Sequence, residues 1–417
     1  MLLKSLFKNN SLKLDNNNSP RGEYEPSYGR QTKSGETVSV FSSQGIATAY
    51  RAKNIISDAV AIMPFKQYRR VGSDIQSIEP DDVTRNMPYL MQISPNLWGF
   101  SPFYMKKCFV EWLLFYGNAY QWKPPVSPAQ TFILPASRTK PVFDMDGNLW
   151  YEHYFTNSFK PSYIPSVEIL HLMINPDETG YMGRGVISYA RETFGRRIAA
   201  NKTQSMLYSQ GFMPAATIKF DGDLNGDMRK KIRESYEEAM SGSDNAYRLA
   251  IFDKKVLEYT PVDLNLKDSE WLDSISATDD DIALFFGMPG HMLNKGKEAY
   301  NSNEEKFEEF VTLTLDPFLV PWEEGARIRY IPEAEQATTY FKFKREALLR
   351  MKAQERATLN QTRIQSGQMT PNEARAMEEQ NPYPLGSRYY MNSATVPIES
   401  LSAQNTETTP PQKEPNL

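Results

Sequence analysis

A helical pattern of apolar residues stands out in the second half of the chain. Its apolar positions recur three, four or seven residues apart, which predicts a helix with one packing face. These positions are Leu272, Ile275, Ile282 and Phe286. Pro289 and Gly290 should end the helix, because proline lacks a backbone N–H and disfavours a helical residue before it. A polar loop then leads into a second helical pattern, which begins near Asn301.

The second helical pattern is long and contains prolines. Its apolar face is formed by Phe307, Phe310, Val311, Thr314 and Phe318. Pro317 and Pro321 fall inside the pattern, so we expect them to kink or break the helix. The loop between the two helices, residues 288–300, carries Lys295 and Lys297. A basic loop between a helix and a bent helix is suited to project from a rigid frame.

The first half of the chain predicts a mixed α/β domain over residues 40–182, after a polar, flexible arm over residues 1–39. Helices are expected at residues 44–60, 84–93 and 103–115. Ser101 should cap the last of them, with Pro102 in its first turn. Strands are expected at residues 65–71, 119–122, 131–134 and 149–155. Gly147 and its neighbours predict a hairpin turn, because such a turn needs positive φ angles.

A long basic helix is expected at residues 186–209, with Arg191, Arg196, Arg197 and Lys202. Its basic face is either a solvated surface with salt bridges or a contact between subunits. Residues 216–220, 228–240 and 247–252 then predict a strand, a helix and a strand, which form a small β-α-β unit.

The C-terminal part predicts a strand at residues 337–344 and a charged helix at residues 345–365 that ends at Gly367. Thr370 and Glu373 have the spacing of a capping box, which predicts a short helix to about residue 380. Residues 396–417 are polar and are expected to be disordered.

Composition narrows the class of protein. With 417 residues, 40% of them hydrophobic and 24% charged, the chain should form an ordinary globular protein of two or three domains. Its net charge of −4 argues against a dedicated nucleic-acid-binding protein, but not against a conduit through which DNA passes. Cys108 is the only cysteine, so an internal disulfide is excluded and a buried structural thiol is expected. No apolar run is long enough to span a bilayer and no plausible signal peptide is present, so we expect synthesis in the cytoplasm and no membrane partner.

Two motifs come close to known ligand sites. Residues 290–298 resemble a phosphate-binding P-loop, but they have one residue too many between the glycines, and Glu298 replaces the hydroxyl that binds magnesium. Residues 221–227 match the first half of an EF-hand loop, but Ile232 stands where the bidentate carboxylate belongs. A helix-capping turn is favoured there, and weak calcium binding stays open. We therefore predict no metal and no cofactor.

Three adjacent aspartates, residues 279–281, suggest a nuclease metal site. They cannot converge on one ion unaided, because successive helical residues point about 100° apart. Asp279 lies between Ile275 and Ile282 on the apolar stripe, where a carboxylate needs a polar partner. It either faces solvent at a helix bend or pairs with an arginine of the earlier helix, Arg196 or Arg197, and we favour the pair.

Several short motifs occur in an order that resembles the portal proteins of tailed bacteriophages. These motifs are residues 169–171, 183–187, 282–289, 300–303, 314–317, 370–375 and 381–382. The resemblance covers residues 45–395 and rests on order and spacing, since no single motif is diagnostic. It implies an α+β portal fold in a non-enzymatic structural protein, which forms a dodecameric ring at one capsid vertex.

The resemblance also divides the chain into regions. They are a wing at residues 40–182, stem helices at 183–211 and 263–287, a clip at 212–262, a tunnel loop at 288–300, a kinked helix and returning wing strand at 301–344, and a crown at 345–395. In this arrangement His291, Asn294, Lys295 and Lys297 would face DNA. Arg196, Arg197 and Asp279 would join the stem helices.

The implied partners are further copies of the chain, the terminase large subunit, a major capsid or scaffold protein, a head–tail adaptor, and double-stranded DNA that passes through without sequence recognition. Two rival classes remain at this point: a metal-dependent nuclease of the same phage, and a capsid or adaptor protein without a channel. The loop lysines could also serve only to keep an exposed connection soluble.

Overall fold

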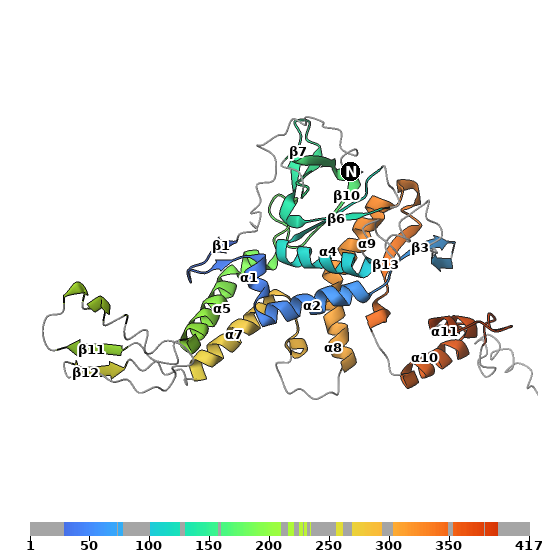
Figure 1. Ribbon diagram of the computed structural model, residues 1–417. Helices are drawn as coiled ribbons and strands as arrows, with labels where there is room; N and C mark the ends of the chain where they lie inside the picture. Colours follow the sequence, from blue (N-terminus) through green and yellow to red (C-terminus); the bar gives the residue numbers. More distant parts are fainter. Residues whose placement is uncertain are drawn as a thin grey trace, which may run out of the picture. The chain divides into compact units, whose positions relative to one another are not determined.

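The computed structural model in Figure 1 contains two compact units, Met1–Leu348 and Leu349–Leu417, and each is described by itself. The residues that the structure describes are 29–72, 74–77, 101–125, 130–156, 160–209, 216–220, 225–227, 229–231, 234, 256–261, 269–293, 303–348, 353–378 and 380–390. The helix expected at residues 84–93, the strand expected at residues 247–252 and the tail at residues 396–417 therefore lie outside the described residues.

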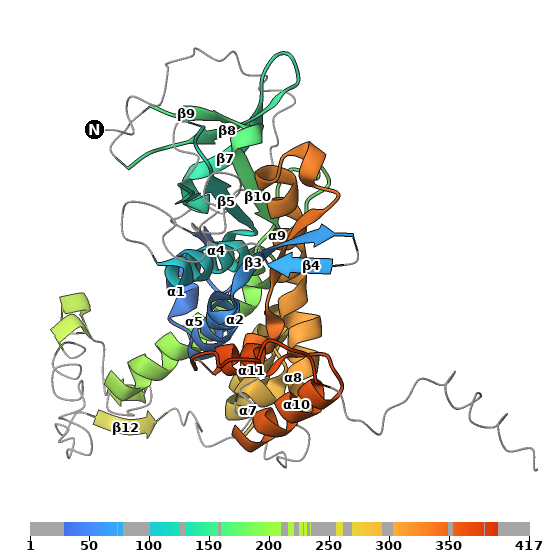
Figure 2. The same ribbon diagram turned by 90° about the vertical axis from the view of Figure 1, so that its right-hand side faces the viewer.

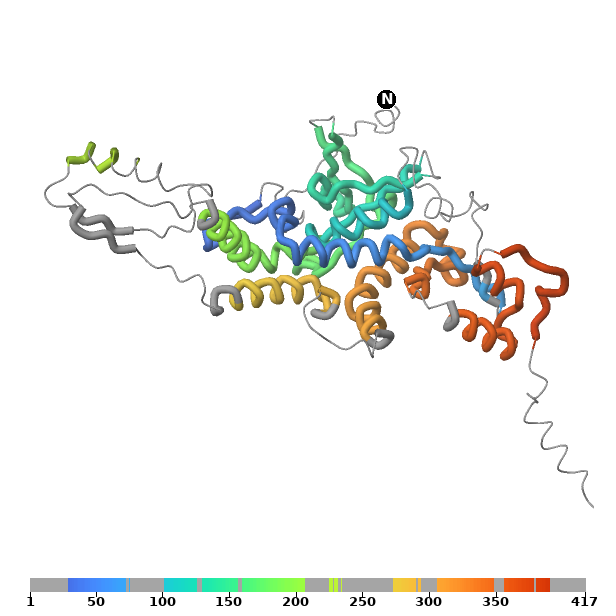
Figure 3. The backbone as a smooth tube through the Cα atoms, turned by 60° about the horizontal axis from the view of Figure 1, so that its bottom comes forward, coloured from blue at the N-terminus to red at the C-terminus, as the bar shows by residue number. Residues whose placement is uncertain are grey.

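Two helices, α2 (Ala47–Ile62) and α4 (Pro102–Tyr116), pack lengthwise in the first unit, as Figure 3 shows. Their buried contact residues include Ile56 and Val60 on α2, and Phe109 on α4. The predicted cap of α4 is confirmed, since Ser101 Oγ accepts a hydrogen bond from the Tyr104 backbone N–H at 3.3 Å. A short helix α1 (Val40–Gln44) precedes α2, so the helix expected at residues 44–60 starts after a break at Gly45.

A three-stranded antiparallel sheet has the order β13-β3-β4. Its strands are β3 (Phe65–Val71), β4 (Asp74–Ser77) and β13 (Thr339–Phe343), and Figure 2 shows β3 and β4 side by side. The face that carries Phe65 and Phe343 is buried, and both rings pack against Trp322 of the long helix. Strands from opposite ends of the first unit thus share one core, and the predicted strands at residues 65–71 and 337–344 are confirmed.

Two further three-stranded antiparallel sheets lie in the middle of the first unit, with the orders β10-β5-β6 and β7-β8-β9. Their strands are β5 (Asn118–Trp122), β6 (Phe132–Leu134), β7 (Thr139–Phe143), β8 (Leu149–His153), β9 (Ser162–Pro165) and β10 (Ile169–Met173). The predicted hairpin joins β7 to β8, and Gly147 has a φ of +83°. The Asp144 carboxylate holds this turn by accepting hydrogen bonds from the Asn148 backbone N–H at 2.7 Å and from Trp150 Nε1 at 2.9 Å.

Asn118 joins two of the motifs that support the resemblance. Its side-chain amide exchanges two hydrogen bonds with the Gly183 backbone, each 2.8 Å long, and its Oδ1 lies 3.0 Å from His171 Nε2. Gly183 has no room for a side chain, since a Cβ would lie 2.1 Å from the Gly117 carbonyl oxygen. The motifs at residues 169–171 and 183–187 therefore meet at one buried polar junction.

The helices α5 (Val186–Ser209) and α7 (Ser269–Phe285) lie side by side in Figure 1. The bounds of α5 match the prediction. Strands β1 (Arg30–Gln31) and β2 (Thr37–Val38) form a hairpin that contacts α5. The prediction of a flexible arm up to residue 39 is therefore wrong for residues 30–39, because Val38 is fully buried and Thr32 packs against Gly195.

The region predicted as a β-α-β unit is built differently in its described part. The strand β11 (Ala216–Phe220) is present as expected, but its partner is β12 (Val256–Pro261), which the sequence did not indicate. The two strands are antiparallel. The second strand predicted at residues 247–252 lies outside the described residues. Within the predicted helix at residues 228–240, the described residues 229–231 and 234 are helical, and residues 226–227 just before it are helical as well.

The long helix near the prolines is continuous. It consists of α8 (Asn303–Glu309), a π-helical segment at Phe310–Leu315 and α9 (Asp316–Tyr330). Pro317 directly follows the π-helical segment, and Pro321 lies inside α9. The irregularity thus precedes the prolines as a π-helix; of the predicted kink or break, the break is not observed.

Short 3₁₀ helices complete the first unit at Ala136–Arg138, Ser166–Glu168, Gly290–Leu293, Glu333–Glu335 and Arg345–Leu348. The last one corrects the predicted start of the charged helix at residue 345, because residues 345–348 form a 3₁₀ helix instead. Arg345 belongs to the first unit, because its guanidinium bonds to Asp316 at 2.7 Å and Glu323 at 3.0 Å on α9.

The second unit contains α10 (Ala353–Gln365) and α11 (Pro371–Met377). The predicted stop after α10 is confirmed, with Gly367 at a φ of +73°. Both bonds of the predicted capping box are present, since Glu373 N donates to Thr370 Oγ1 at 3.2 Å and Thr370 N donates to Glu373 Oε2 at 2.7 Å.

Candidate functional site

The contact between α5 and α7 includes the ion pair expected from the sequence. Arg197 Nε lies 2.8 Å from Asp279 Oδ1, and each side chain is only 16% exposed. Arg197 also donates to Asn201 Oδ1, one turn further along α5. The structure thus has the favoured arrangement, in which Asp279 pairs with an arginine of the earlier helix and does not face solvent.

Arg196 makes a different contact from its neighbour. Its Nη2 lies 3.8 Å from Asp281 Oδ2, and the two side chains are 61% and 52% exposed. Exposed pairs of this kind contribute little to stability, because water and salt screen the charges. Arg196 therefore does not share the buried pair that Arg197 forms with Asp279.

The other charges of α5 hold the N-terminal hairpin. Lys202 Nζ lies 3.0 Å from Glu36 Oε1, and the Lys33 backbone N–H donates to Glu192 Oε2 at 3.1 Å. The hairpin can approach closely because position 195 is glycine, where a Cβ would lie 2.5 Å from Thr32 Oγ1. Several charged residues of α5 are thus engaged within the chain.

The residues from which the loop at residues 288–300 starts are fixed by packing and by a hydrogen bond. Phe286 and Met288 are buried on either side of Gly287, which has a φ of +63° that favours glycine. Thr314 Oγ1, in the π-helical segment, donates to the Gly287 carbonyl oxygen at 2.6 Å. A hydroxyl from the second helix thus fixes the point where the first helix ends.

The next residues of the loop are held from α2. Arg51 donates from Nε and Nη2 to the Met292 carbonyl oxygen, at 3.4 and 3.3 Å, and Leu293 is 9% exposed. The described part of the loop stops there. Asn294, Lys295 and Lys297 lie outside the described residues, as does the side chain of His291.

The described histidines are structural. Burial lowers the pKa of His171 to about 3 and that of His153 to about 4, so both imidazoles are neutral at pH 7. Among the described residues, no group of three or more His, Cys, Asp or Glu side chains could hold a metal ion. No helix in the described part of the chain is both long and apolar enough to cross a bilayer.

Arg51 and Thr314 are the residues of this site that sequence reasoning missed. Thr314 stood on the predicted apolar face, where a hydroxyl is a signal for a hydrogen-bonded role. Arg51 gave no local signal, because its partner is 241 positions away.

The family model described as "Phage portal protein" matches residues 47–379. The "Probable portal protein" of Streptomyces phage phiC31 is 25% identical over 395 residues, which cover 88% of this chain and 82% of that protein. The "Portal protein" of Enterobacteria phage HK97 is 24% identical over 365 residues, with coverages of 85% and 84%.

Solved structures share the fold. The crystal structure of a HK97 family phage portal protein from Corynebacterium diphtheriae has a TM-score of 0.53 at 16% identity, and covers 74% of this chain and 95% of that one. A chain from the neck of a native gene transfer agent particle, computed with C12 symmetry, has a TM-score of 0.52 at 20% identity, with coverages of 87% and 97%.

These comparisons define a structural protein of phage particles and not an enzyme. The chain belongs to the phage portal protein family, whose model spans most of its length.

Proposed function

We propose that the chain is the subunit of a closed ring at one vertex of a phage capsid, and that double-stranded DNA passes through this ring during packaging and ejection. The family match over residues 47–379 is the observation that carries the proposal. A heterologous contact whose rotation closes produces a ring, and the related neck structure was computed with C12 symmetry. A dodecamer is accordingly the expected assembly.

The regions implied by the resemblance supply the parts of this ring. The wing is the α/β part at residues 40–182, the stem is the α5–α7 pair, the clip is residues 212–262, and the crown falls in the second unit. The ion pair between Arg197 and Asp279 supports the stem assignment, because it ties together two helices that the clip separates in sequence. Contacts with the terminase, a capsid or scaffold protein and a head–tail adaptor stay predictions of this proposal.

The loop at residues 288–300 is the proposed DNA-facing element. Its described base is fixed by Thr314 and Arg51, which supports a loop presented from a rigid frame. In a ring, His291, Asn294, Lys295 and Lys297 would line the channel, with Glu298 limiting the local charge. Lysine contacts to phosphate are independent of sequence and sensitive to salt, so they let DNA slide.

Ring formation is tested directly by electron microscopy and native mass spectrometry of the purified full-length chain. The expected result is a ring with a central hole and a mass near twelve subunits. Monomers alone, at every protein and salt concentration, would contradict the proposal. A nuclease or an adaptor without a channel predicts no such hole, so the same images separate the three classes.

The loop is tested by replacing Lys295 and Lys297 together with alanine. Rings should form normally, while DNA packaging or retention changes most at low salt, where screening is weakest. Replacing Lys66 and Lys342 with alanine removes the same charge elsewhere and is the matched control. These two lysines stand opposite each other on the neighbouring strands β3 and β13. Equal behaviour of both double variants at all salt concentrations would remove the proposed role of the loop lysines.

A further inference from the structure

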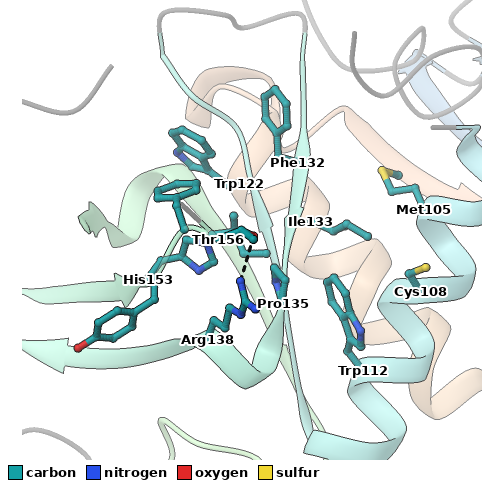
Figure 4. A pocket seen from close by; sticks show the side chains of 13 residues that line it. Met105, Cys108, Trp112, Trp122, Phe132, Ile133, Pro135, Arg138, His153 and Thr156 are labelled. Atoms are coloured by element: carbon teal, nitrogen blue, oxygen red, sulfur yellow. Dashed lines mark hydrogen bonds between the residues drawn. The ribbon is translucent and has the colours of Figure 1, made fainter. Parts of the chain in front are cut away.

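A pocket of about 270 Å³ opens among α4, the strands β5 and β6, and the end of β8 (Figure 4). Most of its described wall is aromatic or aliphatic. The apolar lining includes Trp112, Trp122, Phe132, Ile133, Pro135 and Phe155. Its described lining residues all fall between Met105 and Thr156, so the pocket is separate from the base of the loop at residues 288–300.

One side chain gives the pocket its charge. Arg138 is the only formally charged group at neutral pH among the described residues that line it, and Figure 4 shows its bond from Nη1 to Thr156 Oγ1, which is 2.9 Å long. His153 is neutral there because burial depresses its pKa, and its Nδ1 lies 2.8 Å from Thr139 Oγ1. The described lining contains no aspartate or glutamate.

The carboxylates beside the pocket are already bonded. Glu168 Oε2 accepts a hydrogen bond from Trp122 Nε1 at 2.9 Å, and Glu152 pairs with Lys140 at 3.4 Å. Neither residue belongs to the described lining. An anion placed beside Arg138 would therefore meet a positive charge at the edge of an apolar wall.

The size of the pocket indicates what it can hold. Sites for drug-sized ligands usually have volumes of roughly 300–1,000 Å³, so this pocket is slightly too small for that class. It suits one large side chain with a short polar neighbour. Aromatic walls favour an aromatic guest, and buried aromatic side chains often dominate the energy of protein interfaces.

We propose that this wing pocket receives an aromatic side chain of a partner protein, with an adjacent carboxylate that pairs with Arg138. The pocket is a docking point on the wing that does not depend on the channel.

Cys108 reports whether the pocket is occupied. It lines the pocket and is the only cysteine of the chain, so its rate of reaction with N-ethylmaleimide measures access. Burial raises the pKa of its thiol, so the reaction is followed at mildly alkaline pH, where more thiolate forms. The probe is N-acetyl-phenylalanine, which joins an aromatic ring to a carboxylate and should bind with a dissociation constant of about 1 mM.

Saturating probe should suppress the reaction of Cys108, and the neutral analogue N-acetyl-phenylalaninamide should bind about tenfold more weakly. Arg138→Gln keeps a donor for Thr156 and should weaken the acid about tenfold but leave the amide unchanged. Arg70→Gln makes the same substitution at an exposed arginine outside the pocket and is the matched control. Ile133→Trp, which fills the pocket, should abolish protection, with thermal unfolding used to verify that each variant is folded.

Absence of protection at any soluble concentration of probe would overturn the proposal. So would equal binding of acid and amide with no effect of Arg138→Gln. Comparing the Cys108 rate in isolated subunits and in assembled rings identifies the occupant. Protection by ring assembly alone would assign the pocket to a second copy and refute a different partner.

Discussion

Removal of the Asp279 carboxylate should loosen the contact between α5 and α7 far more than removal of the nearby Asp281 carboxylate. The Arg197 side chain is only 16% exposed, so Asp279→Ala leaves a largely buried guanidinium without its carboxylate partner. Asn201 Oδ1 still accepts one hydrogen bond from this guanidinium. Breaking a fully buried pair costs about 3–5 kcal/mol, and exposed pairs contribute about 0–1 kcal/mol. For this partly buried pair we expect about 2 kcal/mol.

Asp281→Ala is the matched control in the same helix. It removes a carboxylate 3.8 Å from Arg196, where both side chains are more than half exposed, so the expected cost is below about 0.5 kcal/mol. The double replacement of Arg197 by Met and Asp279 by Leu substitutes apolar groups for the pair. It should cost less than the sum of the single replacements, because it leaves no unpaired charge.

Hydrogen exchange of the α5 and α7 amides is the suitable assay, since a chain with two compact units need not unfold in one step. A drop of about 2 kcal/mol in opening free energy corresponds to roughly thirtyfold faster exchange. Equal effects of Asp279→Ala and Asp281→Ala would refute the reasoning, because they would show that burial of the pair does not matter.

Thr314, the two histidines with lowered pKa values and the expected absence of catalysis give three other predictions. Thr314→Val keeps the shape of the side chain but removes its hydrogen bond to Gly287, which should cost about 1–2 kcal/mol. Proteolysis near residues 288–302 should therefore accelerate about tenfold. Thr312→Val, at an exposed position in the same segment, should change the rate of proteolysis little. His153 and His171 have folded pKa values of about 4 and 3, below the ordinary 6.5, so the unfolded chain binds protons first. The free energy of unfolding should therefore fall as pH drops below about 6.5, by roughly 1.4 kcal/mol per pH unit for each histidine. When urea unfolding is measured at a series of pH values, His171→Asn should lose less unfolding free energy per pH unit than the original chain. The purified protein should neither hydrolyse ATP nor cut DNA with magnesium, and turnover lost in Lys297→Ala or Asp280→Ala would contradict its structural role.

Features encoded by near neighbours could be predicted from the sequence. The bounds of α5, the Ser101 cap and the Thr370–Glu373 capping box depend on residues within a few turns of one another. The pair between Arg197 and Asp279 was also accessible, because a carboxylate on an apolar stripe needs a partner and the basic helix offered one.

Features that depend on distant contacts were missed. Residues 30–38 read as an arm because they are mostly polar and charged, but Gly195 on α5 leaves room for Thr32, and the hairpin packs there. The strand β12 lacked a turn signal linking it to β11, since the two are separated by a long connection. The π-helix was likewise missed, because the two prolines indicated an irregularity at residues 317–321, whereas the π-helical segment lies just before them at Phe310–Leu315.

The π-helix also bears on why the loop has a rigid base. Thr314 is buried within this segment, and its hydroxyl reaches the residue at which α7 has ended. Arg51 reaches the same loop from α2, which packs against α7 as well as the π-helix. Two elements that are distant from α7 in the sequence, α2 and the π-helix, thus fix the start of one loop. In a ring, symmetry repeats this anchor in every subunit, so the loops would be set at one radius by the core of each subunit and not by contact with DNA.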